Sequence, residues 1–516
     1  MIKKPIKIFA IIFIILALLV GVHSFFSRGK KKPEPKEVIV ARVAHKTISL
    51  NEFIRRAEFT IRPNYCKGNY NIHKKIILNS LIAEKMLALE AEKNNTDLLN
   101  NKHFQRYIQG RREQAMRQWL YYQEGVRKVK LDSSEVKKIF KLAGRNYKLY
   151  FFTIDNDSVA EIIKQKLHVK KEPFAKVYKE YAGTDTIPEK ELKFNPNIHN
   201  DIYKSLYQNN VKVNQIIGPL KLDQNLFIVL KVKGWTDYPA ISSQDKEKRL
   251  LDVKQWLSDE QALKIYDKFV SKIMKGKGLK FNPDIFRKIG KLLMTFHYNF
   301  KPKTTNLFLN LTFNKKIDEP LFSPNFENGI EKLKDQSFFK INGHVWTVKD
   351  FINELEKHPL VFRKKIIEPR EFPSQFKLAI VDMIRDHYLT KEAYKRRYDK
   401  INIIKRNEEM WKDAILALYQ EKKYLKDLHV NVKNENQNKI IEKFLNPYID
   451  SLQTKYSDMI EINVHAFEKI QLTRIDMFAI QENVPFPIIV PSFPLLTTDH
   501  KLDYGKKMKK NVEIKL

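Results

Sequence analysis

A short pattern occurs twice in this chain, and it restricts the possible folds more than any other feature. The first copy spans residues 40–54 and the second spans residues 338–352. Each copy reads as a short strand, a turn, a second short strand and the start of a helix. A matching amphipathic helix follows each copy, over 77–91 and 379–393, with a small insertion in the second. The sequence therefore predicts a duplicated unit, the alternative being two unrelated helices that happen to follow two hairpins.

The residues that begin the two short helices support the duplication. Ser49 stands three residues before Glu52, and Thr347 stands three residues before Asp350. This is the spacing of a capping box, in which the N-terminal hydroxyl and the third residue of the helix exchange hydrogen bonds with the backbone. Because aspartate is a weaker version of the usual Glu or Gln, we expect the first copy to have the better box.

The N-terminus indicates export. Three lysines precede an apolar run over 8–22, which extends toward Phe26, and a basic cluster over 28–32 follows it. This is either a secretory signal peptide or an uncleaved anchor. The run is at the short end of what a membrane-spanning helix needs, and no good cleavage site follows it. We expect an anchor that crosses the membrane once and leaves the bulk of the protein outside the cytoplasm.

Composition limits the other possibilities. The net charge of +35 suggests nucleic acid, but lysine greatly outnumbers arginine and the charge is spread along the whole chain. We therefore expect no nucleic-acid partner. Cys66 is the only cysteine, so neither a disulfide within the chain nor a cysteine metal cluster can form. We expect it to be an incidental thiol in a loop.

The repeated unit resembles the N-terminal region of SurA/PpiD-type periplasmic folding factors. The stretch 40–53 is similar to the hairpin of that family, and the stretch 78–91 is similar to the helix after it. The resemblance covers residues 38–275, with 337–396 as a degenerate second copy. It implies a location at the cell inner membrane, single-pass, with the bulk in the periplasm, or secretion to the periplasm if the signal is cleaved.

Residues 147–235 resemble a parvulin (PpiC-type) prolyl isomerase domain. The order of a strand, helices and two further strands is the order of that family. The middle of the family pattern is carried by 174–175 and 181–182, and its end by 217–220 and 227–232. The alternative is a small α+β domain with a chance similarity.

The departures from the parvulin pattern concern its site. Active parvulins place histidines on the first and last strands, and the equivalent positions here are Phe151 and Ile228. A glycine-rich stretch has become 189–193, which is charged. The site has thus exchanged a polar core for an apolar one. We expect no catalytic residue, because an apolar site is poorly suited to twisting an amide across a barrier of roughly 18–20 kcal/mol. We also expect no cofactor and no metal, because the sequence has no His-Glu-x-x-His motif and no phosphate-binding glycine-rich loop.

The expected fold class is α+β, mostly helical, with two SurA-N-like helical modules and an inserted parvulin-like domain behind an N-terminal transmembrane helix. The expected division of the chain is 1–26 signal anchor or signal peptide, 27–37 linker, 38–140 first helical module, 141–238 parvulin-like domain, 239–280 helix returning to the helical module, 281–407 second module, and 408–516 C-terminal helical region with a proline-rich extended strap over 484–494.

The function that this organisation predicts is an ATP-independent envelope chaperone. Its partners would be unfolded or extended exported polypeptides, which expose apolar side chains that an apolar surface can hold weakly. Two alternatives stay open: an active peptidyl-prolyl isomerase and a structural scaffold of an envelope complex. The scattered histidines, His73, His103, His168 and His199, are expected to be surface or loop residues and not ligands.

Overall fold

The computed structural model describes residues 37–94, 97–195, 201–222, 226–299, 324–364, 367–430, 436–472 and 488–508. These residues form a mostly helical α+β structure with three small sheets, which confirms the predicted fold class at this level. The expected membrane segment lies outside the described residues. Among the helices in the described ranges, none is long and apolar enough to cross a membrane.

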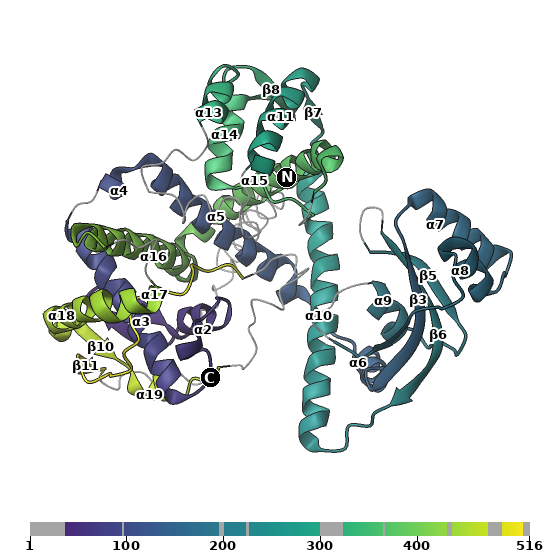
Figure 1. The fold of residues 1–516 in the computed structure, drawn as a ribbon, viewed down its shortest axis with the longest axis horizontal. Coiled ribbons are helices and arrows are strands. Elements are labelled where there is room, and N and C mark those ends of the chain that lie inside the picture. Colours follow the sequence, from purple (N-terminus) through teal and green to yellow (C-terminus); the bar gives the residue numbers. More distant parts are fainter. Residues whose placement is uncertain are drawn as a thin grey trace, which may run out of the picture.

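The chain divides into two halves that repeat one order of elements, with a further domain inserted in the first (Figure 1). The first half contains β1 (Ile39–Val43), β2 (Lys46–Ser49), α2 (Leu50–Glu58), α3 (Asn71–Lys93), α4 (Asp97–Asn100), α5 (Lys102–Glu124), and, after the inserted domain, α10 (Ser243–Met274), β7 (Leu279–Phe281) and α11 (Pro283–Asn299). The second half contains α13 (Pro324–Glu331), β8 (Ser337–Ile341), β9 (His344–Thr347), α14 (Val348–Lys357), α15 (Phe372–Lys395), α16 (Asn402–Asp427), α17 (Gln437–Ile440), α18 (Asn446–Tyr456), β10 (Ile460–Ile462), α19 (Val464–Glu468) and β11 (Lys506–Lys507).

Each half supplies a strand to the sheet of the other. The hairpin β1–β2 pairs antiparallel with β10 of the second half, and the hairpin β8–β9 pairs antiparallel with β7 of the first half. The two registers are equivalent, because Val43 lies opposite Ile460 and Ile341 lies opposite Leu279. The C-terminal parts of the two halves, which contain β7 and β10, are therefore exchanged. Neither hairpin has a complete sheet without the other half.

The third main helix of each half, which is α5 in the first half and α16 in the second, is exchanged as well. Helix α16 of the second half packs along α3, while α5 of the first half packs along α14 and α15. Arg117 of α5 donates a hydrogen bond to Thr390 of α15 over 2.8 Å. Where α5 meets α16, the rings of Tyr107 and Trp411 lie edge to face, with centroids 6.0 Å apart. Figure 1 shows α5 running from the lobe that contains α3 and α16 toward α10.

The first lobe is the part of the protein built from β1, β2, α2 and α3 together with α16, α18, β10 and α19. A buried ionic network joins the two halves of the chain inside this lobe. Asp413 of α16 accepts hydrogen bonds from Lys46 over 2.6 Å and from Lys85 over 3.0 Å. Lys85 also donates to Glu52 over 2.8 Å. Burial alone would raise the pKa of the Asp413 carboxyl, but the two lysines hold it below its ordinary value. All four side chains are buried, so each charge depends on the others.

The same network changes the N-terminal cap of α2, as a comparison with α14 shows. Thr347 and Asp350 form the full reciprocal capping box at the start of α14. Ser49 accepts the backbone N–H of Glu52 over 3.1 Å at the start of α2, but the Glu52 carboxylate is bound to Lys85. The expectation that the first copy has the better box is therefore wrong, because a buried ion pair takes the side chain that would complete it.

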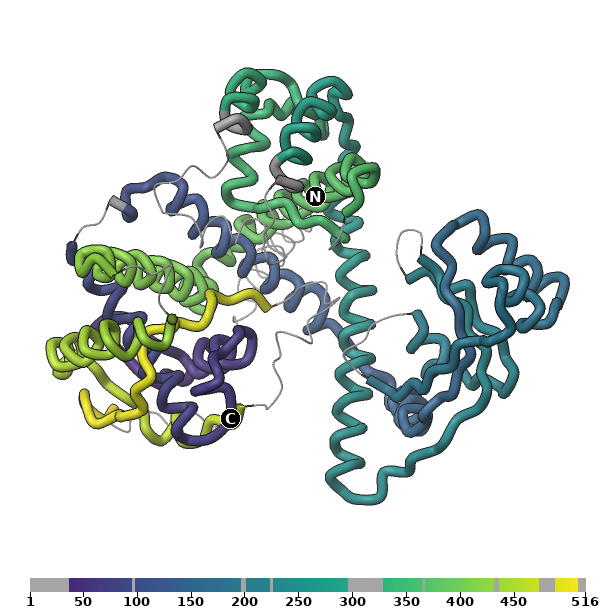
Figure 2. The backbone as a smooth tube through the Cα atoms, viewed as in Figure 1, coloured from purple at the N-terminus to yellow at the C-terminus, as the bar shows by residue number. Residues whose placement is uncertain are grey.

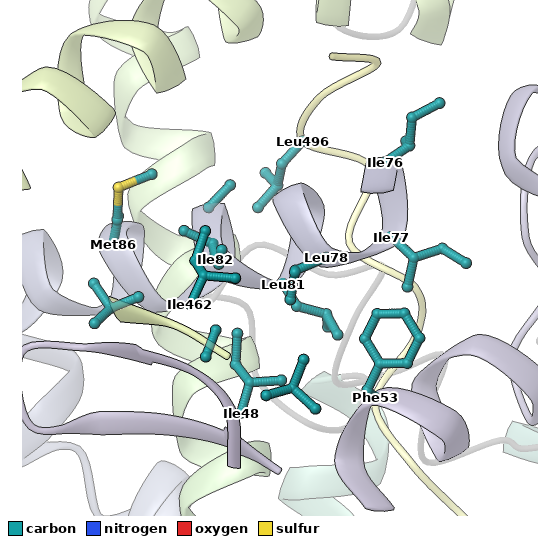
Figure 3. Close-up of a cluster of buried hydrophobic side chains, with 14 of the residues drawn as sticks. Ile48, Phe53, Ile76, Ile77, Leu78, Leu81, Ile82, Met86, Ile462 and Leu496 are labelled. Atoms are coloured by element: carbon teal, nitrogen blue, oxygen red, sulfur yellow. The ribbon is translucent and has the colours of Figure 1, made fainter. Parts of the chain in front are cut away.

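The C-terminal segment completes the core of the first lobe. In Figure 2 the yellow end of the tube lies beside the purple N-terminal elements. Phe493 and Leu496 are buried in that core, and Figure 3 shows Leu496 and Ile462 among side chains of α2 and α3. Arg56 donates to the Ser492 carbonyl oxygen over 2.7 Å. The described part of the strap, 488–494, has no helix or strand; the rest lies outside the described residues.

Cys66 lies in the connection between α2 and α3, as expected for a loop thiol, but it is fully buried in the core of the first lobe. Burial raises the pKa of its thiol to about 12. A thiol with this pKa is inert, because the thiolate is the reactive form.

Candidate functional site

The inserted domain is a four-stranded antiparallel sheet with helices on both sides. Its elements are α6 (Ser133–Leu142), β3 (Arg145–Ile154), α7 (Asp157–Lys164), α8 (Phe174–Ala182), β4 (Glu189–Leu192), α9 (Asp201–Tyr203), β5 (Ile216–Lys221) and β6 (Phe227–Asp237), with the strands in the order β4-β3-β6-β5. Helices α6 and α9 lie on the side of the sheet toward α10, and α7 and α8 cover the other side (Figure 1).

The core of this domain extends beyond the range 141–238 expected from the sequence. Trp256 and Leu257 of α10 are buried against the sheet, together with Val136 and Ile139 of α6. Helix α10 therefore contacts both the inserted domain and the second half of the chain. Its first part closes the inserted domain, and its far end packs against α15 of the second half.

Phe151 and Ile228, the two positions that the sequence analysis compares with the histidines of active parvulins, lie on adjacent strands and on the same face of the sheet. Phe151 of β3 pairs with Leu230 of β6, and Ile228 pairs with Thr153. Phe151 and Ile228 are therefore diagonal neighbours, which is within reach of an aromatic side chain. Ile228 belongs to the apolar core shared with α6 and α10, and Phe151 packs against it while half-buried.

The same face continues as an apolar surface along the ends of β5 and β6 that follow Leu220 and precede Ile228. Leu220 lies opposite Ile228. The Leu222 N–H donates to the Leu226 carbonyl oxygen over 2.8 Å, so these two residues also lie opposite each other. Because alternate residues of a strand share a face, these four residues lie on the same side of the sheet as Phe151. We name Phe151, Leu220, Leu222, Leu226 and Ile228 the apolar strip.

The strip changes from buried to exposed along its length. Ile228 is 8% exposed, whereas Leu222 and Leu226 are 37% and 39% exposed. Such a surface can bind apolar side chains of another polypeptide. Each Å² of apolar area that this contact removes from water contributes roughly 25 cal/mol of favourable free energy. None of its five side chains can donate or accept a proton. Sequence reasoning does not single out Leu222; the signal it overlooks is the pair of leucines, Leu222 and Leu226, separated by three polar residues in the sequence.

The histidines named from the sequence do not gather. His103 is exposed and pairs with Glu356 over 3.0 Å, and His73 accepts the Gly68 N–H over 2.9 Å. His168 lies 2.5 Å from the Gly218 carbonyl oxygen, on the side of the sheet away from the strip. His199 is outside the described residues. Within the part of the chain that the structure describes, no group of three His, Cys, Asp or Glu side chains is placed to hold a metal ion.

No family model, no curated protein and no solved structure matches this chain.

Proposed function

We propose that this protein is an exported, membrane-anchored chaperone of the SurA/PpiD type. It holds unfolded or extended exported polypeptides without ATP, and its parvulin-like domain is catalytically inactive. The apolar strip is the observation that carries the proposal. It lies where the resemblance puts the isomerase site, and its end is exposed. It offers apolar contact without any group that forms a polar network around an amide.

The exchanged halves support the same proposal. A protein that holds clients by weak contacts needs a frame that stays folded while its binding surface is occupied and vacated. Here each of the two sheets uses strands from both halves of the chain. The inserted domain packs on the long α10, and the same helix packs against α5 and α15 of the exchanged halves.

Replacing Leu222 and Leu226 together by serine is expected to weaken the holding of an unfolded substrate. Both side chains are more than a third exposed, so the change removes contact area from the surface and leaves the core intact. A loss of about 1–2 kcal/mol corresponds to about five- to thirtyfold weaker binding. The measurement is light scattering of a chemically denatured substrate diluted into increasing amounts of the full chain, without nucleotide.

The matched control replaces Ile162 and Val169 by serine. These side chains are even more exposed, at 56% and 67%, but they belong to α7 and the turn after it, on the opposite side of the sheet. The control variant is expected to hold substrate as well as the unchanged chain. If the two variants behave alike, the strip is not the client surface. Deleting a half is a poorer test, because each half completes the other.

The chain is expected not to accelerate prolyl isomerisation. Neither Phe151 nor Ile228 can take part in a hydrogen-bonded network around the amide. Refolding limited by an X–Pro bond takes tens to hundreds of seconds without a catalyst, and a stoichiometric amount of the chain should leave this rate unchanged. A proline-containing short peptide should be assayed in parallel, since it separates catalysis from holding. A clear acceleration in both assays would favour the active-isomerase alternative.

A further inference from the structure

A cavity lies on the inserted domain, at the end of the sheet away from the exposed part of the apolar strip. Its volume is about 310 Å³, and it lies between α6, the beginning of β3, the end of β6 and the chain near Asn210. Its walls include Lys138 and Lys141 of α6, Arg145 and Trp235. This size is at the lower end of the range for pockets that bind small ligands or single side chains.

The charge of this cavity is one-sided. None of the residues that line it is acidic. The nearest acid to Arg145 is Asp237, whose carboxylate is 3.4 Å from the Arg145 Nε and whose side chain is 66% exposed. A further cation lies beside Gly144, the residue before Arg145: Arg249 of α10 donates to the Tyr238 carbonyl oxygen over 2.7 Å. A surface with this excess of cations favours an anionic group.

Arg145 has the geometry to receive such a group. Its guanidinium lies over the Trp235 ring, 4.3 Å from the ring centroid, and this stacking holds its plane in place. The Nε is buried and makes no hydrogen bond within the described residues, and its ion pair with Asp237 is open to solvent. A planar guanidinium with donors to spare binds a carboxylate through two parallel hydrogen bonds.

We propose that this cavity binds carboxylate groups of polypeptides. Arg145 would make the directed contact, Lys138 and Lys141 would supply the charge, and Trp235 would pack against the aliphatic part of the bound residue. The inference goes beyond the proposed function, because it names a second site and the chemical group that the site recognises. Its test uses short peptides, so its result does not depend on whether the apolar strip holds clients.

The experiment measures the binding of three fluorescent peptides of one neutral sequence to the full chain by fluorescence anisotropy at low salt. The first has a free C-terminal carboxylate, the second is amidated, and the third is amidated but contains two glutamates. The first or the third should bind about tenfold more tightly than the second, and the comparison tells a terminal carboxylate from a side-chain carboxylate. Equal binding of all three would overturn the proposal.

Two variants place the binding site. Lys138→Gln with Lys141→Gln changes two exposed side chains and should weaken binding of the carboxylate peptide about fivefold or more. Lys176→Gln with Lys179→Gln on α8 removes the same charge from the other side of the domain and should leave binding almost unchanged. Equal losses in the two variants would mean that the net charge binds the peptide. Displacement of the peptide by an equal concentration of inorganic phosphate would also contradict the proposal.

Discussion

Replacing Asp413 by alanine is expected to lower the free energy of unfolding by about 3–5 kcal/mol. The carboxylate lies between Lys46 and Lys85, and the side chain of Lys85 is 1% exposed. Removing the acid leaves Lys85 paired with Glu52 and Lys46 paired with Glu92, with one negative charge fewer beside two buried lysines. Asp413 belongs to the second half and both lysines belong to the first. The lost stability therefore comes from the contact that joins the two exchanged halves.

The control for this prediction is Glu409→Ala, which removes an acidic side chain from an exposed place on the same helix. It should change stability by less than about 0.5 kcal/mol, as surface substitutions usually do. Urea unfolding followed by circular dichroism measures both variants. Comparable stabilities for the two would show that the network in the first lobe does not hold α16 in place.

A double variant tests the cause of the loss. In Lys85→Met with Asp413→Leu, the uncompensated charge is removed together with its partner. Replacing a buried ion pair by apolar side chains is often neutral or stabilising, so this variant should be more stable than Asp413→Ala alone. Lys46 and Glu52 keep charges near the site, and the recovery is therefore expected to be partial.

The local elements were within reach of sequence reasoning, because each has a local signal. The hairpins β1–β2 and β8–β9 lie where the repeated pattern predicts two short strands, and the helices α2 and α14 begin directly after the predicted caps Ser49 and Thr347. The exchange of the C-terminal parts could not be predicted from the sequence. The strands β7 and β10 are only three residues long, and so short a strand has no local signal for which hairpin it pairs with. Connectivity decides between them. Helix α10 has 32 residues, roughly 48 Å, and carries β7 toward the second half.

The candidate site was predictable to the same degree. Sequence reasoning identifies Phe151 and Ile228 as one apolar place, and the structure puts both on one face of adjacent strands. It does not show which neighbours continue that face, because this depends on the register of β5 against β6 and on a bulge between Ile217 and Leu220. The charged cavity was also hidden, since Arg145 and Trp235 are far apart in the chain and meet only through strand pairing.

Replacing Gly110 by alanine is expected to cost about 3 kcal/mol of stability, because α5 and α14 approach closely at this residue. A Cβ atom at Gly110 would lie 2.0 Å from the carbonyl oxygen of Lys357 and 2.7 Å from its carbonyl carbon. Both are backbone atoms at the end of α14, so no side-chain rotation relieves the overlap and the helices must separate. The separation would weaken contacts on either side of Gly110, such as the 3.0 Å hydrogen bond from Arg106 to Asn353.

The same substitution at Gly290 gives the matched control, because both glycines lie in the interior of a helix. A Cβ atom at Gly290 would meet the Phe376 ring at 3.6 Å, which is an ordinary contact. Alanine favours a helix over glycine by about 1 kcal/mol, so Gly290→Ala should be neutral or slightly stabilising. Thermal and urea unfolding should therefore show a clear loss of stability for Gly110→Ala and no loss for Gly290→Ala. If Gly110→Ala also gained stability, α5 would not lie against α14 as described, and the exchange of the third helices would lose its main support in the second half.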